Sequence, residues 1–234
     1  MITEMDRIKM IIAEGAKKGM PLSKFIDLQI NDFKQSKNYE EMIQGGKYFK
    51  NEGDIEDKKR TYINQNGVEE VAPHAKNYIL KHPILYKMIN QKAGYLLRKK
   101  PTIKQLIAKD ETEDEEYKEI LKALFNNKMH KRLKYTLIET VKRGICWWQI
   151  YIDDEGDLKA RLRYATRIIP LWQDEEHEIL DAVIMTYDVE VYTSATDREK
   201  RTKVEYWDLD GVRYLIYDGS SLIEDVEEVE KRKD

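Results

Sequence analysis

The dominant hydrophobic period of this chain changes at Gly144, and that change limits the folds the chain can adopt. Before Gly144, apolar residues recur every three to four positions, as on one face of a helix. After it, apolar and polar residues alternate, as in half-buried strands. Helices followed by antiparallel strands predict an α+β fold in which the strands form a meander.

Local signals place the helices before Gly144. Pro21 can begin a helix because its missing N–H costs little in the first turn. Gly144 can end one, and Pro101 stops another whose last turn would hold Arg98, Lys99 and Lys100. The expected helices are one carrying Ile8, Ile11 and Ile12, one after Pro21, one over 39–49, one over 76–100, one after an acidic loop at 110–114, and one over 127–143.

Turn signals divide the rest of the chain into strands. Asn66-Gly67 and Asp210-Gly211 are two-residue hairpin signals, and acidic turns are expected at 153–157 and 173–178. Leu222, Val226 and Val229 have the spacing of a short helix in the charged tail. The expected strands are 61–63, 68–71, 145–152, 158–164, 167–172, 180–187, 190–193, 203–209 and 212–217.

These elements predict four regions along the 234 residues. Residues 1–52 form an N-terminal helical region, and 53–143 hold a hairpin and further helices. Residues 144–218 form the antiparallel β part, and 219–234 form a charged tail.

Composition excludes several classes of protein. Charged residues make up 36% of the chain, yet 41 Lys and Arg against 44 Asp and Glu leave a net charge of only −3. Such a balance argues against a protein that coats DNA indiscriminately, although it leaves room for a local basic face. The start of the chain lacks the apolar core of a signal peptide, and no window predicts a membrane span. With the lone Cys146, these features predict a soluble protein made in a reducing cytosol.

The sequence predicts no catalytic residue, cofactor or metal site. His74, His82, His130 and His177 share no ligand-pair spacing, and Cys146 lies in an apolar strand. Phosphate-binding loops, dinucleotide fingerprints and hydrolase nucleophile motifs are absent. An enzyme with a Mg²⁺ site on Asp153 and Asp154 is a further alternative, which would require activity that depends on both carboxylates.

Basic residues are the more informative polar groups. Arg161 and Arg163 are two positions apart in an expected strand and therefore share one sheet face. Arg98 and Lys99 end an expected helix, Lys128, Lys131, Arg132 and Lys142 lie on another, and Arg167 follows Arg161 and Arg163 along the expected β segments. Such groups can contact phosphates, contact acidic residues of a neighbouring subunit, or form a solvated face balanced by nearby acids.

Two stretches of the chain each hold several short motifs in a fixed order. In 78–103, a His-Pro step precedes an Asn-Gln-Lys segment, a Tyr-Leu-Leu segment with basic residues, and a Pro-Thr-Ile exit. In 143–188, a glycine precedes tryptophans on a strand, an acidic hairpin, Ile168–Trp172 with an acidic turn after it, and Leu180–Ile184. In their order and spacing, over roughly half the chain, these pieces resemble the portal proteins of tailed phages, of the type found in siphophages of Gram-positive hosts.

The resemblance implies a portal wing-like fold and a structural role without catalysis. Portal proteins form a ring, usually a dodecamer, at one capsid vertex of the virion, and double-stranded DNA passes through its channel without sequence specificity. The implied partners are further copies of the chain, capsid or scaffold proteins, the terminase and head-completion proteins. Family members are about twice as long, so the stem, clip and channel segments that contact the motor are expected outside these 234 residues.

The implied location is the virion, after assembly in the host cytoplasm. Within that role, Arg161, Arg163, Arg98 and Lys99 are candidate subunit-interface or DNA-facing residues. The alternative function is a nucleic-acid-binding or processing protein that uses the basic helix ends, with an affinity for DNA that falls steeply with salt.

Overall fold

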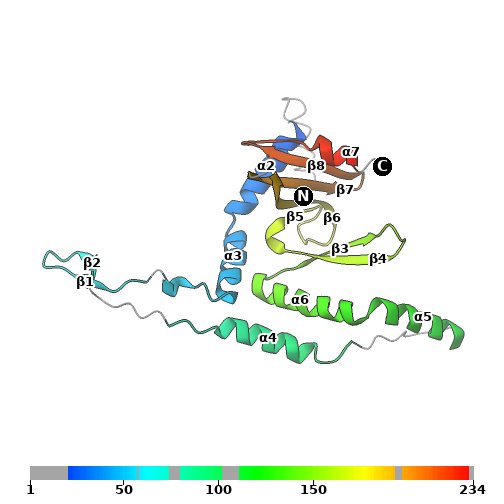
Figure 1. The fold of residues 1–234 in the computed structure, drawn as a ribbon, viewed down its shortest axis with the longest axis horizontal. Coiled ribbons are helices and arrows are strands. Elements are labelled where there is room, and N and C mark those ends of the chain that lie inside the picture. The colour runs from blue at the N-terminus through cyan, green and yellow to red at the C-terminus, as the bar shows by residue number, and fades with distance from the viewer. Residues whose placement is uncertain (1–20, 57, 74–79, 102–110, 193–196, 232–234) are drawn as a thin grey trace. The chain divides into compact units, whose positions relative to one another are not determined.

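The structure is a computed structural model that describes residues 21–56, 58–73, 80–101, 111–192 and 197–231 (Figure 1). It divides into two compact units. Unit 1 comprises residues 1–40 and 147–234, and unit 2 comprises residues 41–146. The α+β fold predicted from the change of period is confirmed, because helices precede a meander of antiparallel strands.

Unit 1 is built around a five-stranded antiparallel sheet in which each strand pairs with the next along the chain. Its strands are β5 (Ile168–Trp172), β6 (Leu180–Tyr192), β7 (Arg198–Asp208), β8 (Gly211–Asp218) and β9 (Ser221–Glu224). The predicted strands at 180–187 and 190–193 are one continuous strand, β6. Leu222, predicted to lie in a helix, pairs with Tyr217 in β9, and only α7 (Val226–Lys231) is helical.

Helix α2 (Leu22–Gln35) covers one face of this sheet. Alternate residues of the strands point to that face, as the period of two requires, and they form one buried cluster with the apolar side of α2. The cluster contains Phe25, Ile26, Ile30, Ile169, Leu171, Ala182, Ile184, Val204, Tyr206, Leu215 and Leu222. Tyr217 Oη also donates to Asp27 Oδ1 at 2.6 Å, which ties the helix to β8.

The opposite face of the sheet meets a separate two-stranded sheet. Strands β3 (Trp147–Ile152) and β4 (Leu158–Arg163) form this antiparallel hairpin. An apolar pocket of about 170 Å³ is lined from both sides, by Trp147 and Trp148 of β3 and by Val183, Met185 and Trp207 of the larger sheet. Val183, Met185 and Trp207, which alternate with residues of the α2 face, therefore face the hairpin.

Unit 2 holds most of the helical residues. Its described elements are α3 (Lys37–Phe49), which begins in unit 1, a 3₁₀ turn at Asp54–Glu56, the strands β1 (Thr61–Ile63) and β2 (Glu69–Val71), and helices α4 (Ile84–Leu96), α5 (Glu111–Leu124) and α6 (Asn127–Arg143). Asn126 caps α6, where its side chain accepts from the N–H groups of Lys128 and Met129. Gly144 ends α6 with φ +85°, which confirms the predicted C-terminal glycine.

Some predicted helix boundaries are wrong. The helix expected over 76–100 begins at Ile84, because Pro83 disfavours helical backbone at the residue before it. It ends at Leu96, so Arg98 and Lys99 follow the helix instead of occupying its last turn. Residues 111–114, expected in a loop, already belong to α5. The first expected helix, with Ile8, Ile11 and Ile12, lies outside the described residues.

Two hairpin turns in different units have the same construction. Asn64 and Asp153 each begin a turn in which the side-chain Oδ1 accepts from backbone N–H groups two and four residues later. A glycine with positive φ stands at the fourth position, Gly67 at +76° and Gly156 at +83°. The loop between β1 and β2 comprises residues 64–68, one residue more than the expected strands leave between them. Between β7 and β8 the loop is Leu209-Asp210, and Gly211 is the first residue of β8.

Among the described residues, the helices are too short or too polar to cross a membrane.

Candidate subunit-interface site

The pairing of β3 with β4 places the predicted arginines side by side. Arg161 lies opposite Gln149 and Arg163 lies opposite Trp147, so the two arginines share a face of the hairpin as their spacing predicts. Both line a hollow of about 680 Å³ between the hairpin and the five-stranded sheet. We call this feature the arginine hollow. Its lining also includes Arg167, which directly precedes β5, and Tyr187 and Glu205 of the sheet.

A buried carboxylate forms part of the hollow's wall. Glu205 of β7 is only 6% exposed, and its oxygens accept from Tyr187 Oη at 2.9 Å and Trp207 Nε1 at 3.0 Å. Arg163 is partly buried and donates from Nε and Nη2 to Gln149 Oε1 at 3.0 and 2.7 Å. Burial lowers the pKa of the Arg163 guanidinium, and the nearby Arg161 lowers it further, whereas Glu205 opposes both effects. Arg163 is thus held by Gln149 and lies near enough to Glu205 to interact with its charge.

The other two arginines of the hollow are exposed. The Arg161 guanidinium lies 5.2 Å from the ring centre of Tyr151, and that of Arg167 lies 5.7 Å from the ring centre of Tyr164. Neither forms an ion pair with a carboxylate in the part of the chain that the structure describes. Their rings orient the two guanidinium groups without neutralising them, so their charge is available to an anionic group.

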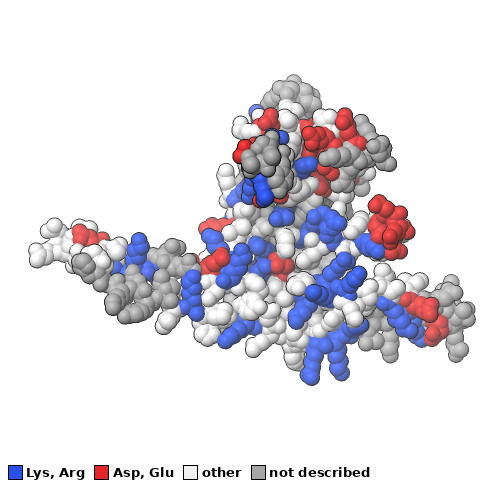
Figure 2. All heavy atoms as spheres, in the orientation of Figure 1, with Lys and Arg blue, Asp and Glu red and all other residues white. Residues whose placement is uncertain are grey.

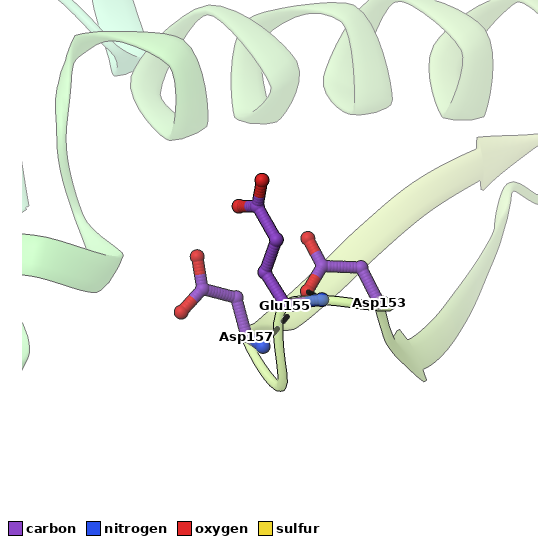
Figure 3. Close-up of side chains that lie close together, drawn as sticks. All are labelled: Asp153, Glu155 and Asp157. Carbon is purple, nitrogen blue, oxygen red and sulfur yellow. Dashed lines mark hydrogen bonds between the residues drawn. The ribbon is translucent and has the colours of Figure 1, made fainter.

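The acidic hairpin turn is explained by its own hydrogen bonds. Asp153, Glu155 and Asp157 bring their carboxylates within 4.8 Å of one another (Figure 3). Lys159 Nζ lies 3.1 Å from Asp153 Oδ2 and 2.8 Å from Asp157 Oδ2, so an ammonium group already neutralises part of this charge. The backbone N–H of Asp157 lowers the pKa of Asp153, assisted by Lys159. The turn at Asn64 reaches the same geometry with an amide, so the backbone arrangement does not require a metal.

The remaining predicted basic residues belong to unit 2 and do not join the arginine hollow. Arg98 and Lys99 are exposed in the segment after α4. On α6, Lys128, Lys131 and Arg132 are exposed, and Figure 2 shows Lys and Arg side chains gathered over this helix. Lys142 is different, because it is largely buried, ion-paired with Glu139, and 4.9 Å from the ring centre of Phe49.

The histidines and the cysteine show no shared site in the described residues. His82 precedes the Pro83 cap of α4, His130 lies in α6, and His177 stacks on Trp172 with ring centres 5.2 Å apart. His74 lies outside the described residues. Cys146 is partly buried in the segment before β3.

Arg167 belongs to the basic residues that the sequence singled out, whereas the sequence did not predict a role for Gln149, Tyr187 or Glu205. Glu205 is an acidic residue between Val204 and Tyr206, and that polar position in an apolar stretch was the available signal. The others carried no signal, because they come together only when the hairpin folds over the sheet.

The family model described as "Phage portal protein, SPP1 Gp6-like" matches residues 31–234, and the chain therefore belongs to this family of phage structural proteins. The chain is also 27% identical to the portal protein of Bacillus phage SPP1, over 233 residues that cover 92% of this chain and 42% of that protein. The chain thus spans less than half the length of the curated relative it matches, and the predicted family is confirmed.

Proposed function

We propose that this chain is a structural part of a portal ring at the capsid vertex of a phage virion, through which double-stranded DNA is packaged and ejected. The observation that carries the proposal is the family match over residues 31–234. In this role the chain performs no catalysis and needs no cofactor. Its partners are other copies of itself in a dodecameric ring, capsid or scaffold proteins, and the terminase and head-completion proteins.

The charge and composition of the arginine hollow also support this proposal. A closed ring uses a heterologous interface, so each copy must present two different and complementary surfaces. A hollow with two exposed arginines that form no ion pair in the described part of the chain is one such surface. Interfaces are enriched in arginine and tyrosine, and both line this hollow.

Imaging tests the proposed role directly. The complete product of the gene that encodes these residues is expected to form closed rings in negative-stain electron micrographs, and a tag on it is expected to mark a single vertex of purified virions. Particles that remain monomeric at high concentration, or label spread over the whole capsid, would contradict the proposal.

The charge of the hollow gives a second test. Reversing Arg161 and Arg163 together to Glu is expected to impair assembly, and unchanged assembly would remove this face from the interface. Because Arg163 is partly buried and interacts with the charge of Glu205, its reversal would also place a second carboxylate in a partly buried site. Reversing the exposed Arg161 and Arg167 therefore separates assembly from folding more cleanly.

The exposed Lys and Arg side chains of α6 favour a second candidate function, which is non-specific contact with nucleic acid. Lys128, Lys131 and Lys134 repeat at intervals of three, so they lie on neighbouring positions of one side of the helix. Replacing Lys128 and Lys131 with Gln should weaken binding to duplex DNA and make it less salt-dependent. DNA affinity that is unchanged by both substitutions would reject α6 as the contact.

A further inference from the structure

Unit 1 carries two exposed sets of opposite charge that do not neutralise each other. One set is the arginine hollow, and the other is the segment Gln173–Glu178, which we call the acidic loop. We propose that the hollow of one copy receives the acidic loop of the next copy, in a head-to-tail contact between subunits. This inference rests on the proposed ring function and identifies the two surfaces that such a ring would join.

The acidic loop is ordered by its own hydrogen bonds. Asp174 Oδ2 accepts from the N–H of Glu178 at 2.9 Å, and Asp174 Oδ1 accepts from the N–H of Ile179 at 2.7 Å. These hydrogen bonds lower the pKa of Asp174, and they use both of its oxygens. His177 has a left-handed backbone with φ +59°, and its ring stacks on Trp172. A loop held in this way loses little conformational freedom when it binds.

Two acidic side chains of the loop remain available. Glu175 and Glu176 are exposed and form no ion pair within the described ranges. Arg161 and Arg167 in the hollow are likewise exposed and without an ion pair there. Planar guanidinium groups bind carboxylates through paired N–H donors, so these two sets have complementary chemistry.

Strand β5 keeps the two sets apart within one chain. Arg167 directly precedes β5, whereas Gln173 directly follows it. Five strand residues at about 3.3 Å each place these ends ~17 Å apart, and among the described residues no ion pair joins Arg167 to the loop. A hollow at one end of a strand and an acidic loop at its other end are what a repeating head-to-tail contact requires.

The lining of the hollow favours a protein carboxylate over a DNA backbone. Glu205, Asp153 and Asp154 also line the hollow, and each adds negative charge beside the arginines. A continuous row of phosphates would meet these carboxylates, and like charges brought together in an interface weaken binding. A short loop with two glutamates can reach the arginines alone.

Paired charge reversals test the contact. The first variant is Arg161→Glu with Arg167→Glu, and the second is Glu175→Lys with Glu176→Lys. Each alone is expected to weaken self-association of the chain by at least about tenfold in sedimentation velocity at low salt, because like charges then face each other. An equimolar mixture of the two is expected to regain association, because every hollow can then meet an oppositely charged loop.

Two controls exclude trivial causes. Lys24→Glu with Lys34→Glu makes the same change of net charge as the arginine variant on exposed positions of α2 and should leave association unchanged. A chain with all four substitutions of the two variants should associate as the unmodified chain does. Recovery in the mixture also shows that both variants are folded.

The outcomes separate this contact from the ring itself. If the unmodified chain associates but the reversals do not weaken it, or the mixture does not recover, the hollow–loop contact is wrong and the ring proposal stands. If the unmodified chain does not associate at any concentration, both proposals fail for this chain. If the arginine variant loses only duplex DNA binding, the hollow binds phosphate and the subunit contact is rejected.

Discussion

The two units of this chain bury very different amounts of apolar surface. In unit 1, alternate residues of the sheet and one side of α2 form a single large buried cluster. In unit 2, the buried cluster consists of Ile89, Ala93 and Ile138, with Phe49 and Leu137 packed against it. Helix α4 leaves Met88 60% exposed and Tyr95 84% exposed. Regular secondary structure does not by itself provide a core. The core of unit 1 is larger because strands far apart in sequence direct their side chains to one face of the sheet.

Truncating one buried isoleucine in each unit should show the difference in core packing most clearly. Ile184→Ala in β6, at a position with 0% exposure, is expected to lower the free energy of unfolding of unit 1 by about 4 kcal/mol, through lost burial and a cavity. Ile89→Ala in α4 should cost only about 2 kcal/mol, because loosely packed surroundings can collapse around it.

The positions of the tryptophans allow the unfolding of unit 1 to be measured separately. All four, at 147, 148, 172 and 207, lie in unit 1, so their fluorescence during urea unfolding reports on that unit. Amide hydrogen exchange in α4 and α6 reports on unit 2. Equal losses for the two substitutions would contradict the proposed difference between the units.

The buried network around Glu205 should give the next largest effect. Glu205→Gln keeps the shape of the side chain but turns one acceptor toward Tyr187 or Trp207 into a donor. We expect unit 1 to lose about 1–3 kcal/mol, because a buried polar group is then left without a partner. The matched control is Glu199→Gln, exposed on the same strand, for which urea unfolding should change little.

Two glycines in unit 2 should respond in opposite directions. A Cβ at Gly45 of α3 would lie 2.1 Å from the backbone oxygen of Lys142, whereas a Cβ at Gly94 of α4 would meet nothing within 4 Å. Gly45→Ala is therefore expected to destabilise unit 2 by about 1–3 kcal/mol. Gly94→Ala should stabilise it by about 0.5–1 kcal/mol, because alanine is the better helix former. Thermal melting of the helical circular dichroism, with hydrogen exchange, measures both, and the same sign for both would refute the close contact at Gly45.

The smallest effect is expected at Asp153. Its lowered pKa means that the ionised carboxylate stabilises the β3–β4 turn above its unfolded pKa of about 3.9, and that this contribution is lost as the pH falls through the lower folded value. Asp153→Asn should keep the turn, as Asn64 does in the other hairpin, and remove this acid dependence. Amide chemical shifts of the hairpin followed from pH 7 to pH 2 test this. A turn that opens in the variant, or that closes only with added Mg²⁺, would revive a metal-binding interpretation.

Local signals were reliable wherever a few neighbouring residues decide the backbone. Pro21 and Gly144 mark helix boundaries in the structure as predicted, whereas the start of α4 after Pro83 was not predicted. The alternation after Gly144 predicted the antiparallel strands, and it placed Arg161 and Arg163 on one face. The prediction was wrong at Leu222, because pairing with β8 and burial against the α2 side of the sheet outweigh its helical spacing with Val226.

The candidate site was only partly visible in the sequence. The sequence identified Arg161 and Arg163 as a charged pair, but it did not show that their environments differ. One is exposed over a tyrosine ring, and the other is partly buried beside Gln149. The interface role of Arg161, Arg163, Arg98 and Lys99 stays a prediction.

The sequence by itself determined the α+β class, the position of the change from helices to strands, and the family to which the chain belongs. These properties depend on the hydrophobic period, the turn residues and the order of motifs, all of which can be read directly from the sequence. Only the tertiary structure decided that Arg167 and Glu205 join the two predicted arginines in one hollow, and that β5 separates this hollow from the acidic loop. Such arrangements depend on contacts between segments that are distant in sequence. Those contacts form, and contribute free energy, only when the hairpin packs against the sheet.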